Sequence, residues 1–251
     1  MASRRGLELD GVLLLDKPEG LSSNHALQRA KRALNAKKAG HTGTLDPFAT
    51  GLLVCCLGRA TKISGNLLDA DKIYRARLQF GQETDAGDLT GTVVFEAPAD
   101  FSGVTAEQLE QALTAFRGEI QQVPPMHSAL KRDGKPLYEY ARQGIELERP
   151  PRTVTIHALT LLDCDGMHAD IEVHCSKGTY IRTLAQDIGR LLGCGAHLQA
   201  LRRLKVGPFH LDDSVALDTI QTMSEPQSVL IPLNALPEGL LPQGQQKDKN
   251  L

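Results

Sequence analysis

The segment Gly40–Gly51 (GHTGTLDPFATG) has the residue types and the spacing to present one reactive carboxylate. Its three glycines allow backbone conformations with positive φ or a close approach to a ligand. Pro47 restricts the preceding residue, Asp46, to an extended conformation. A carboxylate held on such a stiff loop, near His41, could serve as a nucleophile. A simple Asp-Pro turn is the alternative, and the spacing alone leaves both interpretations open.

The elements expected around this loop are a basic helix before it and a buried strand after it. Ser22 or Ser23 caps the helix, whose apolar residues fall on one face (Leu27, Ala30 and Leu34). The continuous apolar run 52–57 has the length of a strand. The same patterns predict further strands at residues 12–15, 74–80, 92–95, 152–162, 167–175 and 198–206, and further helices at residues 105–118, 179–192 and about 214–223.

The order of these elements indicates the fold class. Strands outnumber helices, do not alternate regularly with them, and are joined in several places by hairpin-length turns. The sequence therefore predicts an α+β fold with a mixed, largely antiparallel central sheet flanked by helices. A doubly wound fold is disfavoured because neither G-x-G-x-x-G nor G-x-x-x-x-G-K-[ST] occurs.

Residues 119–150 differ in character from their surroundings. They contain Pro124-Pro125, the polar run 131–136 and a short helix that ends at Gly144, so we predict an insertion outside the core. From Pro237 the sequence is rich in Gly, Pro, Gln and Lys, which predicts a disordered tail at 237–251. The remaining chain, 1–236, is expected to form one domain.

Composition excludes several classes of protein. The 251 residues are 41% hydrophobic, which excludes global disorder, and no apolar run approaches the roughly 20 residues of a membrane span. No apolar signal core follows the first residues, so we expect a cytoplasmic protein that does not contact a membrane. Monomer is the default expectation for its oligomeric state.

The five cysteines indicate reduced thiols rather than a disulfide framework. Cys194 and His197 have the spacing of half a zinc site. His174 and Cys175 cannot complete it from one face, because neighbours on a strand point to opposite sides. We therefore expect no metal.

The formal charge of −2, from 28 basic and 30 acidic residues, hides an uneven distribution. Residues 20–45 hold five basic residues and no acidic one, and residues 188–211 hold four and none. The 131–152 segment adds six more basic residues against four acids. Any one cluster could be an ordinary solvated face, but three clusters around the Asp46 loop favour a polyanionic partner.

Several blocks of the sequence, in order, closely resemble one family. They are GVLLLDKPEGLSS (11–23), the Asp46 loop, KIYR (72–75), GQETDAGD (81–88), SALK (128–131), LYEYAR (137–142), CSKGTYIRT (175–183) and LRRL (201–204). Together they span about residues 10–210 and are similar to the TruB family of tRNA pseudouridine synthases. The resemblance implies a pseudouridine synthase fold, no cofactor, and isomerisation of uridine 55 in the T loop, with the tRNA T arm as partner.

The resemblance also implies roles for individual residues. Asp46 matches the catalytic aspartate, and the sequence does not decide whether it attacks C1′, adds to C6 or removes a ribose proton. Tyr74 matches the tyrosine that stacks on the target base and is proposed to help remove the C5 proton. Arg182 matches the arginine that pairs with the aspartate; without the family, a surface arginine at the rim of its helix would be expected.

Other matched positions concern RNA binding. His41 resembles the histidine that helps to take the uridine out of its stack, and Tyr180 and Leu201 match positions that line the uracil pocket. The 119–150 insertion resembles a mobile thumb that closes on the RNA loop. Contacts to the RNA backbone are expected from Lys17, Lys62, Lys131, Arg142 and Arg202.

Two features depart from the family pattern. Bacterial relatives usually carry a small PUA-like RNA-binding domain after the catalytic one, whereas this sequence stops at Leu251. We therefore expect that domain to be absent, which affects contacts to the RNA but not the chemistry. His127 stands where relatives often have a tyrosine, so the corresponding thumb contact is open.

Three other functions remain to be weighed. A glycosidase would need a second carboxylate, which the Asp46 loop does not supply. A calcium loop starting at Asp85 fails because Gly87 and Leu89 occupy ligand positions. A non-catalytic tRNA-binding or tRNA-folding protein would share all the basic segments, but would not need Asp46.

Overall fold

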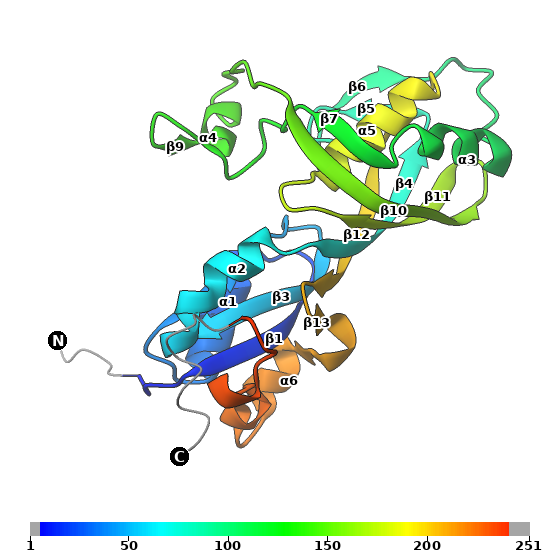
Figure 1. Ribbon diagram of the computed structural model, residues 1–251. Helices are drawn as coiled ribbons and strands as arrows, with labels where there is room; N and C mark the ends of the chain where they lie inside the picture. Colours follow the sequence, from blue (N-terminus) through cyan, green and yellow to red (C-terminus); the bar gives the residue numbers. More distant parts are fainter. Residues whose placement is uncertain (1–5, 241–251) are drawn as a thin grey trace. The chain divides into compact units, whose positions relative to one another are not determined.

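The computed structural model describes residues 6–240, and the chain folds into two compact units. Unit 1 comprises Met1–Lys72 and Arg202–Leu251, and unit 2 comprises Ile73–Leu201 (Figure 1). Strands β4 (Lys72–Phe80) and β12 (Ala196–Val206) carry the chain from one unit into the other. Most of the predicted tail, 241–251, lies outside the described residues. Residues 237–240 are placed, and the Leu240 carbonyl accepts a hydrogen bond from Asn66 (3.2 Å).

The centre of unit 1 is an antiparallel pair, β1 (Gly11–Lys17) and β3 (Thr50–Leu57). Strand β2 (Ala39–Thr42) is antiparallel to β3, and β14 (Val215–Ala216) is parallel to β1. The end of β12 pairs parallel with β3 and then forms a hairpin with β13 (Phe209–His210). The sheet is therefore mixed, as predicted.

Both faces of the β1–β3 pair are covered, which explains why these strands read as continuous apolar runs. Alternate side chains pack on one face against α1 (Ser23–Ala33) and α6 (Leu217–Thr222). The opposite face packs against η1 (Gly58–Ile63) and α2 (Ser64–Asp69). Short helical turns complete the unit: η2 (Leu211–Asp213), η3 (Pro226–Val229) and η4 (Leu233–Ala235).

In unit 2 the strands lie in the order β12, β4, β11 (His168–Cys175), β10 (Arg152–Cys164) and β7 (Gly118–Gln122). Alternate residues of β4 and β11 are buried, so one face of the sheet is apolar. Helices α3 (Ala106–Thr114) and α5 (Ile181–Leu191) add apolar stripes to the same core. A separate hairpin joins β5 (Gln82–Thr84) to β6 (Val93–Glu96).

The predicted insertion begins later than expected. Residues 119–122 belong to β7, which pairs with β10 through the ladder from Arg152↔Gln122 to Ile156↔Gly118. The prediction that the insertion starts at residue 119 is therefore wrong, because polar side chains on an edge strand hide its pairing. The rest contains the hairpin of β8 (Lys131–Arg132) and β9 (Lys135–Pro136), followed by α4 (Leu137–Ala141). In Figure 1 this segment projects away from the β7–β10 edge of unit 2.

The α+β class and the mixed sheet are confirmed by this architecture. The predicted helix at 214–223 is shorter in the structure, because Val215 and Ala216 pair with β1 before α6 begins. The capping box predicted at Thr105 is present: its side chain accepts from the Gln108 amide, and the Gln108 side chain accepts from the Thr105 amide. Among the described residues, no helix is long and apolar enough to cross a membrane.

Candidate active site

The main chain around Asp46 is fixed from both sides within unit 1. Before it, the buried Ser23 hydroxyl accepts a hydrogen bond from the Leu45 amide (2.7 Å) and lies 3.0 Å from the Leu45 carbonyl. After it, the Pro47 carbonyl accepts from the Gly20 amide (2.8 Å) and from the Lys17 ammonium (3.3 Å). The Asp46 carbonyl accepts from the Ala49 amide (3.1 Å). The loop therefore holds the aspartate on a defined backbone, as its sequence predicts.

Lys17 is buried and stabilises the Asp46 loop instead of facing solvent, where it could contact RNA. It is 0% exposed, and its ammonium also donates to the carbonyls of Pro18 (2.8 Å) and Leu21 (2.6 Å). Its three protons are thus directed to three carbonyls around the loop that carries Asp46. The prediction that Lys17 binds the RNA backbone is wrong, because its charged group faces inward.

The burial of Lys17 leads to a prediction about pH and stability. Burial lowers the pKa of Lys17 to about 8 from 10.5, although the charge of Asp46 opposes the shift. Between these two values the unfolded chain binds more protons than the folded one, so stability rises with pH. Urea unfolding should show that, from pH 7.5 to pH 10.5, the free energy of unfolding of the wild type rises by on the order of 3 kcal/mol more than that of Lys17→Met. If the difference in free energy of unfolding between the two proteins does not change with pH, the prediction is wrong.

His41 lies on β2, a few residues before Asp46, and is half-buried. Its ring Nδ1 is buried and has no hydrogen-bond partner among the described residues. Burial and the positive charge of Arg203 lower the pKa of the imidazole. At neutral pH the ring is therefore uncharged, which suits insertion between stacked bases.

In unit 2, Arg182 is buried (4% exposed) in the first turn of α5. Its guanidinium donates to the carbonyls of Ala86 (2.9 Å) and His127 (2.6 Å). The Asp88 carboxylate lies 3.8 Å from its Nε. The surface position that its place on the helix would otherwise suggest is wrong, because the 84–91 turn and the start of the insertion cover it.

Tyr180 is the residue that precedes α5, and a buried glutamine from β7 holds its backbone. The Gln122 side chain accepts from the Tyr180 amide (3.0 Å) and donates to the Tyr180 carbonyl (3.2 Å). Gln122 is only 2% exposed. The amide thus fixes Tyr180 and the start of the helix that carries Arg182.

The two other predicted pocket residues of unit 2 lie on its strands. Tyr74 is half-buried on β4, in the same row as the buried Ala76 and Leu78. Leu201 is 7% exposed on β12. The position of Tyr74 agrees with the alternation read from the sequence, whereas the alternation of residues 198–206 does not account for the burial of Leu201.

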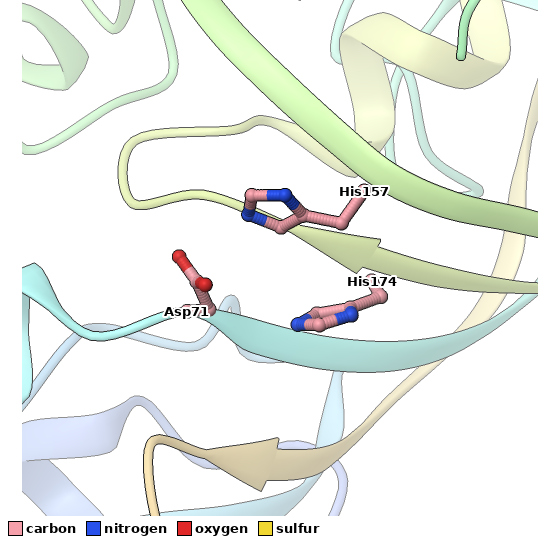
Figure 2. Close-up of side chains that lie close together, drawn as sticks. All are labelled: Asp71, His157 and His174. Atoms are coloured by element: carbon pink, nitrogen blue, oxygen red, sulfur yellow. The ribbon is translucent and has the colours of Figure 1, made fainter. Parts of the chain in front are cut away.

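Two histidines of unit 2 lie on the neighbouring strands β10 and β11. The ring centroids of His157 and His174 are 4.8 Å apart and the rings are tilted by 52° (Figure 2). Asp71, also labelled there, belongs to unit 1. Two imidazoles are half of the ligands of a tetrahedral site, so the pair alone does not make a metal centre.

Comparison with known sequences assigns the family. Residues 31–181 match the family model "TruB family pseudouridylate synthase (N terminal domain)", which covers more than half of the chain. Residues 182–242 match "tRNA pseudouridylate synthase B C-terminal domain". The chain belongs to the TruB family of pseudouridylate synthases. It is therefore an isomerase, as the sequence blocks predicted.

Individual TruB relatives are similar over nearly the whole chain. A protein of Bordetella avium (strain 197N) named "tRNA pseudouridine synthase B" is 70% identical over 96% of this chain and 99% of its own length. One of the same name from Bordetella parapertussis (strain 12822 / ATCC BAA-587 / NCTC 13253) is 69% identical over the same shares. One from Aromatoleum aromaticum (strain DSM 19018 / LMG 30748 / EbN1) is 60% identical over 91% of this chain and 74% of its own length.

Solved structures support the fold. A chain from "Crystal Structure of a Cbf5-Nop10-Gar1 Complex" is 30% identical, with a TM-score of 0.68, over 90% of this chain and 60% of that one. A chain from "Structure of H/ACA RNP bound to a substrate RNA containing 2'-deoxyuridine" is 27% identical, with a TM-score of 0.65 over the same shares. The predicted pseudouridine synthase fold is confirmed.

The other residues expected to contact the RNA backbone differ in their exposure to solvent and in whether they already form an ion pair. Lys62, Lys131 and Arg142 are exposed. Arg202 is half-buried and forms a bidentate ion pair with Asp16 (2.7 and 3.2 Å), so it is already paired within unit 1. The basic cluster at 188–211 is reduced further because Arg190 pairs with Glu83 (2.5 Å) and Arg203 is 1% exposed.

Three residues that fix the backbone near predicted site residues, in one unit or the other, were not predicted from the sequence. They are Ser23, Gln122 and Arg203, each of which binds main-chain atoms of the site. Only Arg203 carried a usable signal. It stands two residues after Leu201 on a strand, and therefore on the same side of that strand as a residue matched to the uracil pocket.

The amide of Gln122 leads to a second prediction. We expect Gln122→Leu to lower turnover by roughly 10-fold through misplacement of Tyr180, because the Tyr180 amide and carbonyl both lose their bond to the side chain, although the carbonyl still accepts from the Leu184 amide. The matched control is Gln121→Leu, on the same strand but exposed, where only a bond to Thr153 (2.8 Å) is lost. Steady-state kinetics and thermal unfolding of both variants measure the effect. Equal turnover in the two variants would contradict it.

Proposed function

We propose that the chain converts uridine 55 in the T loop of tRNA to pseudouridine. The N1–C1′ bond of the target nucleoside breaks, the base turns, and C5 bonds to C1′. The C5 proton is released to solvent and N1 gains a proton, so the reaction requires no net oxidation or reduction. The observation that carries the proposal is the clamped Asp46 loop, in a chain 70% identical to a relative named tRNA pseudouridine synthase B.

The proposal assigns the chemistry to Asp46, Tyr74 and Arg182. Asp46 supplies the carboxylate, on a backbone that the Ser23 hydroxyl and the Gly20 amide fix. Tyr74 stacks on the uracil ring and assists removal of the C5 proton. Arg182, fixed by two carbonyls, supplies a lasting positive charge that pairs with the carboxylate.

Binding of the target base is assigned to His41, Tyr180 and Leu201. The neutral His41 ring enters the space that the uridine leaves, which offsets part of the few kcal/mol that unstacking costs. Exposed basic residues hold the RNA backbone, and they include Lys62, Lys131 and Arg142. The segment 123–150 closes on the T arm as a thumb.

A labelled tRNA tests this function. A tRNA transcript made with [5-³H]uridine should release the tritium of one uridine, and the same transcript with cytidine at position 55 should release none. A T-arm stem-loop should react as the full tRNA does. Release from the position-55 variant would contradict the assignment of the target. Binding without any release would favour the non-catalytic alternative.

A further inference from the structure

Arg203 of β12 lies inside unit 1 with 1% of its surface exposed. Its Nε donates to the Leu52 carbonyl (2.7 Å) and its Nη2 donates to the Gly43 carbonyl (3.1 Å). Gly43 stands before Asp46 and Leu52 after it. One rigid guanidinium therefore joins the two ends of the segment that carries the aspartate.

The backbone of the loop comes close to Arg203 at two glycines. Gly51 is the strand partner of Arg203, has φ +100°, and would place a Cβ clashing with the Arg203 carbonyl oxygen. Gly43 has φ +80°, and a Cβ there would lie 3.4 Å from Nη1 of Arg203. The glycines of the loop thus allow the main chain to close around this side chain.

The partners of this buried charge are main-chain carbonyls, as they are for Lys17. Burying a guanidinium costs several kcal/mol unless its geometry is well satisfied. An apolar side chain could fill the same space at a lower cost in desolvation. A guanidinium offers a rigid planar fork of donors, which holds two carbonyls in a more closely defined relation than a rotating ammonium does.

We propose that Arg203 is a positioning residue of the isomerisation: its guanidinium holds Gly43 and Leu52 together and thereby fixes the Asp46 carboxylate for reaction. Arg203 acts through the loop and does not contact the substrate. The proposal rests on the role assigned to Asp46. It goes beyond that role by naming the group that keeps the carboxylate in its productive place.

Two substitutions separate the geometry from the charge. Arg203→Lys keeps the positive charge and three donors, but it loses the planar fork that sets the directions of the two hydrogen bonds. Arg203→Met removes both the charge and the hydrogen bonds. A displacement of about 1 Å can cost roughly 100-fold, so we expect Arg203→Lys to lower kcat by roughly that factor. The KM for a T-arm RNA should change by less than about 3-fold, because the same contacts to RNA remain.

The matched control for a general loss of stability is Ile220→Ala. Ile220 is 1% exposed on α6, in the core between α1 and the sheet of the same unit. Its truncation lowers the unfolding temperature without a change at the loop. At a temperature where both proteins are folded, Ile220→Ala should keep its kcat. Hydrogen exchange should quicken at residues 43–51 in Arg203→Lys and stay unchanged there in Ile220→Ala.

The outcomes distinguish this proposal from the function on which it rests. Wild-type kcat in Arg203→Lys overturns the positioning role, and so does a loss that the folded fraction alone explains. If Asp46→Asn is inactive and Arg203→Lys fully active, the positioning role alone fails. If Asp46→Asn is active, the role assigned to Asp46 fails, and the positioning role that rests on it fails too. If the wild-type protein releases no tritium, the proposed function itself fails.

Discussion

Asp46→Asn is expected to lower the rate of tritium release from [5-³H]uridine tRNA by at least about 10⁴-fold, because the amide can neither attack carbon nor accept a proton as a carboxylate does. The loop is fixed through main-chain atoms of Leu45 and Pro47, the two neighbours of Asp46. The groups that bind these atoms are Ser23, Gly20 and Lys17. The substitution is nearly isosteric and leaves these bonds in place. Affinity for the T-arm RNA should therefore stay within about 3-fold of wild type.

Single-turnover assays with enzyme in excess measure this prediction, and fluorescence anisotropy of a labelled T-arm RNA measures the binding. Asp213→Asn is the matched control, since Asp213 is an exposed carboxylate of unit 1. It should react at the wild-type rate. Turnover by Asp46→Asn within 10-fold of wild type would mean that Asp46 is not the reactive group. Loss of RNA binding together with turnover would point to a collapsed loop.

Much of the fold was predictable because its signals are local. Alternation along β4 and the two-faced apolar runs of β1 and β3 reflect burial that each strand carries in its own residues. Ser22 caps α1 and Thr105 caps α3, as the side-chain types indicated. The loop around Asp46 was recognisable because its glycines permit positive φ and its proline restricts the preceding residue, wherever the loop lies.

The errors concern groups whose roles arise from tertiary contacts. Lys17 and Arg203 read as surface charges, yet each is buried and donates to at least one carbonyl distant in sequence, Pro47 for Lys17 and Gly43 for Arg203. Gln122 looked like part of an insertion, because the pairing of β7 depends on β10. Composition assigns such residues to solvent. Only the folded structure shows that the donor groups of these side chains meet main-chain carbonyls.

Arg182→Lys is the second substitution from which we expect a large loss, roughly 100- to 1000-fold in kcat. The arginine's Nη1 and Nη2 donate to the carbonyls of Ala86 and His127, which come from two different segments of unit 2. Lysine keeps the charge, but its ammonium lacks the planar fork whose two arms reach the carbonyls of Ala86 and His127, so its position is no longer fixed in the same way. The loss should resemble removal of one preorganised electrostatic group from a buried site.

Arg77→Lys is the matched control for this substitution. Arg77 lies on β4 of the same unit, is partly exposed, and pairs with Asp170 at 3.3 Å. A surface pair of this kind contributes little, so that variant should keep its turnover and stability. Because His127 belongs to the segment 123–150 that is expected to close on RNA, Arg182→Lys should also weaken T-arm binding by a few-fold. Wild-type kcat in Arg182→Lys would show that the charge alone suffices and that the fork of hydrogen bonds serves only the fold.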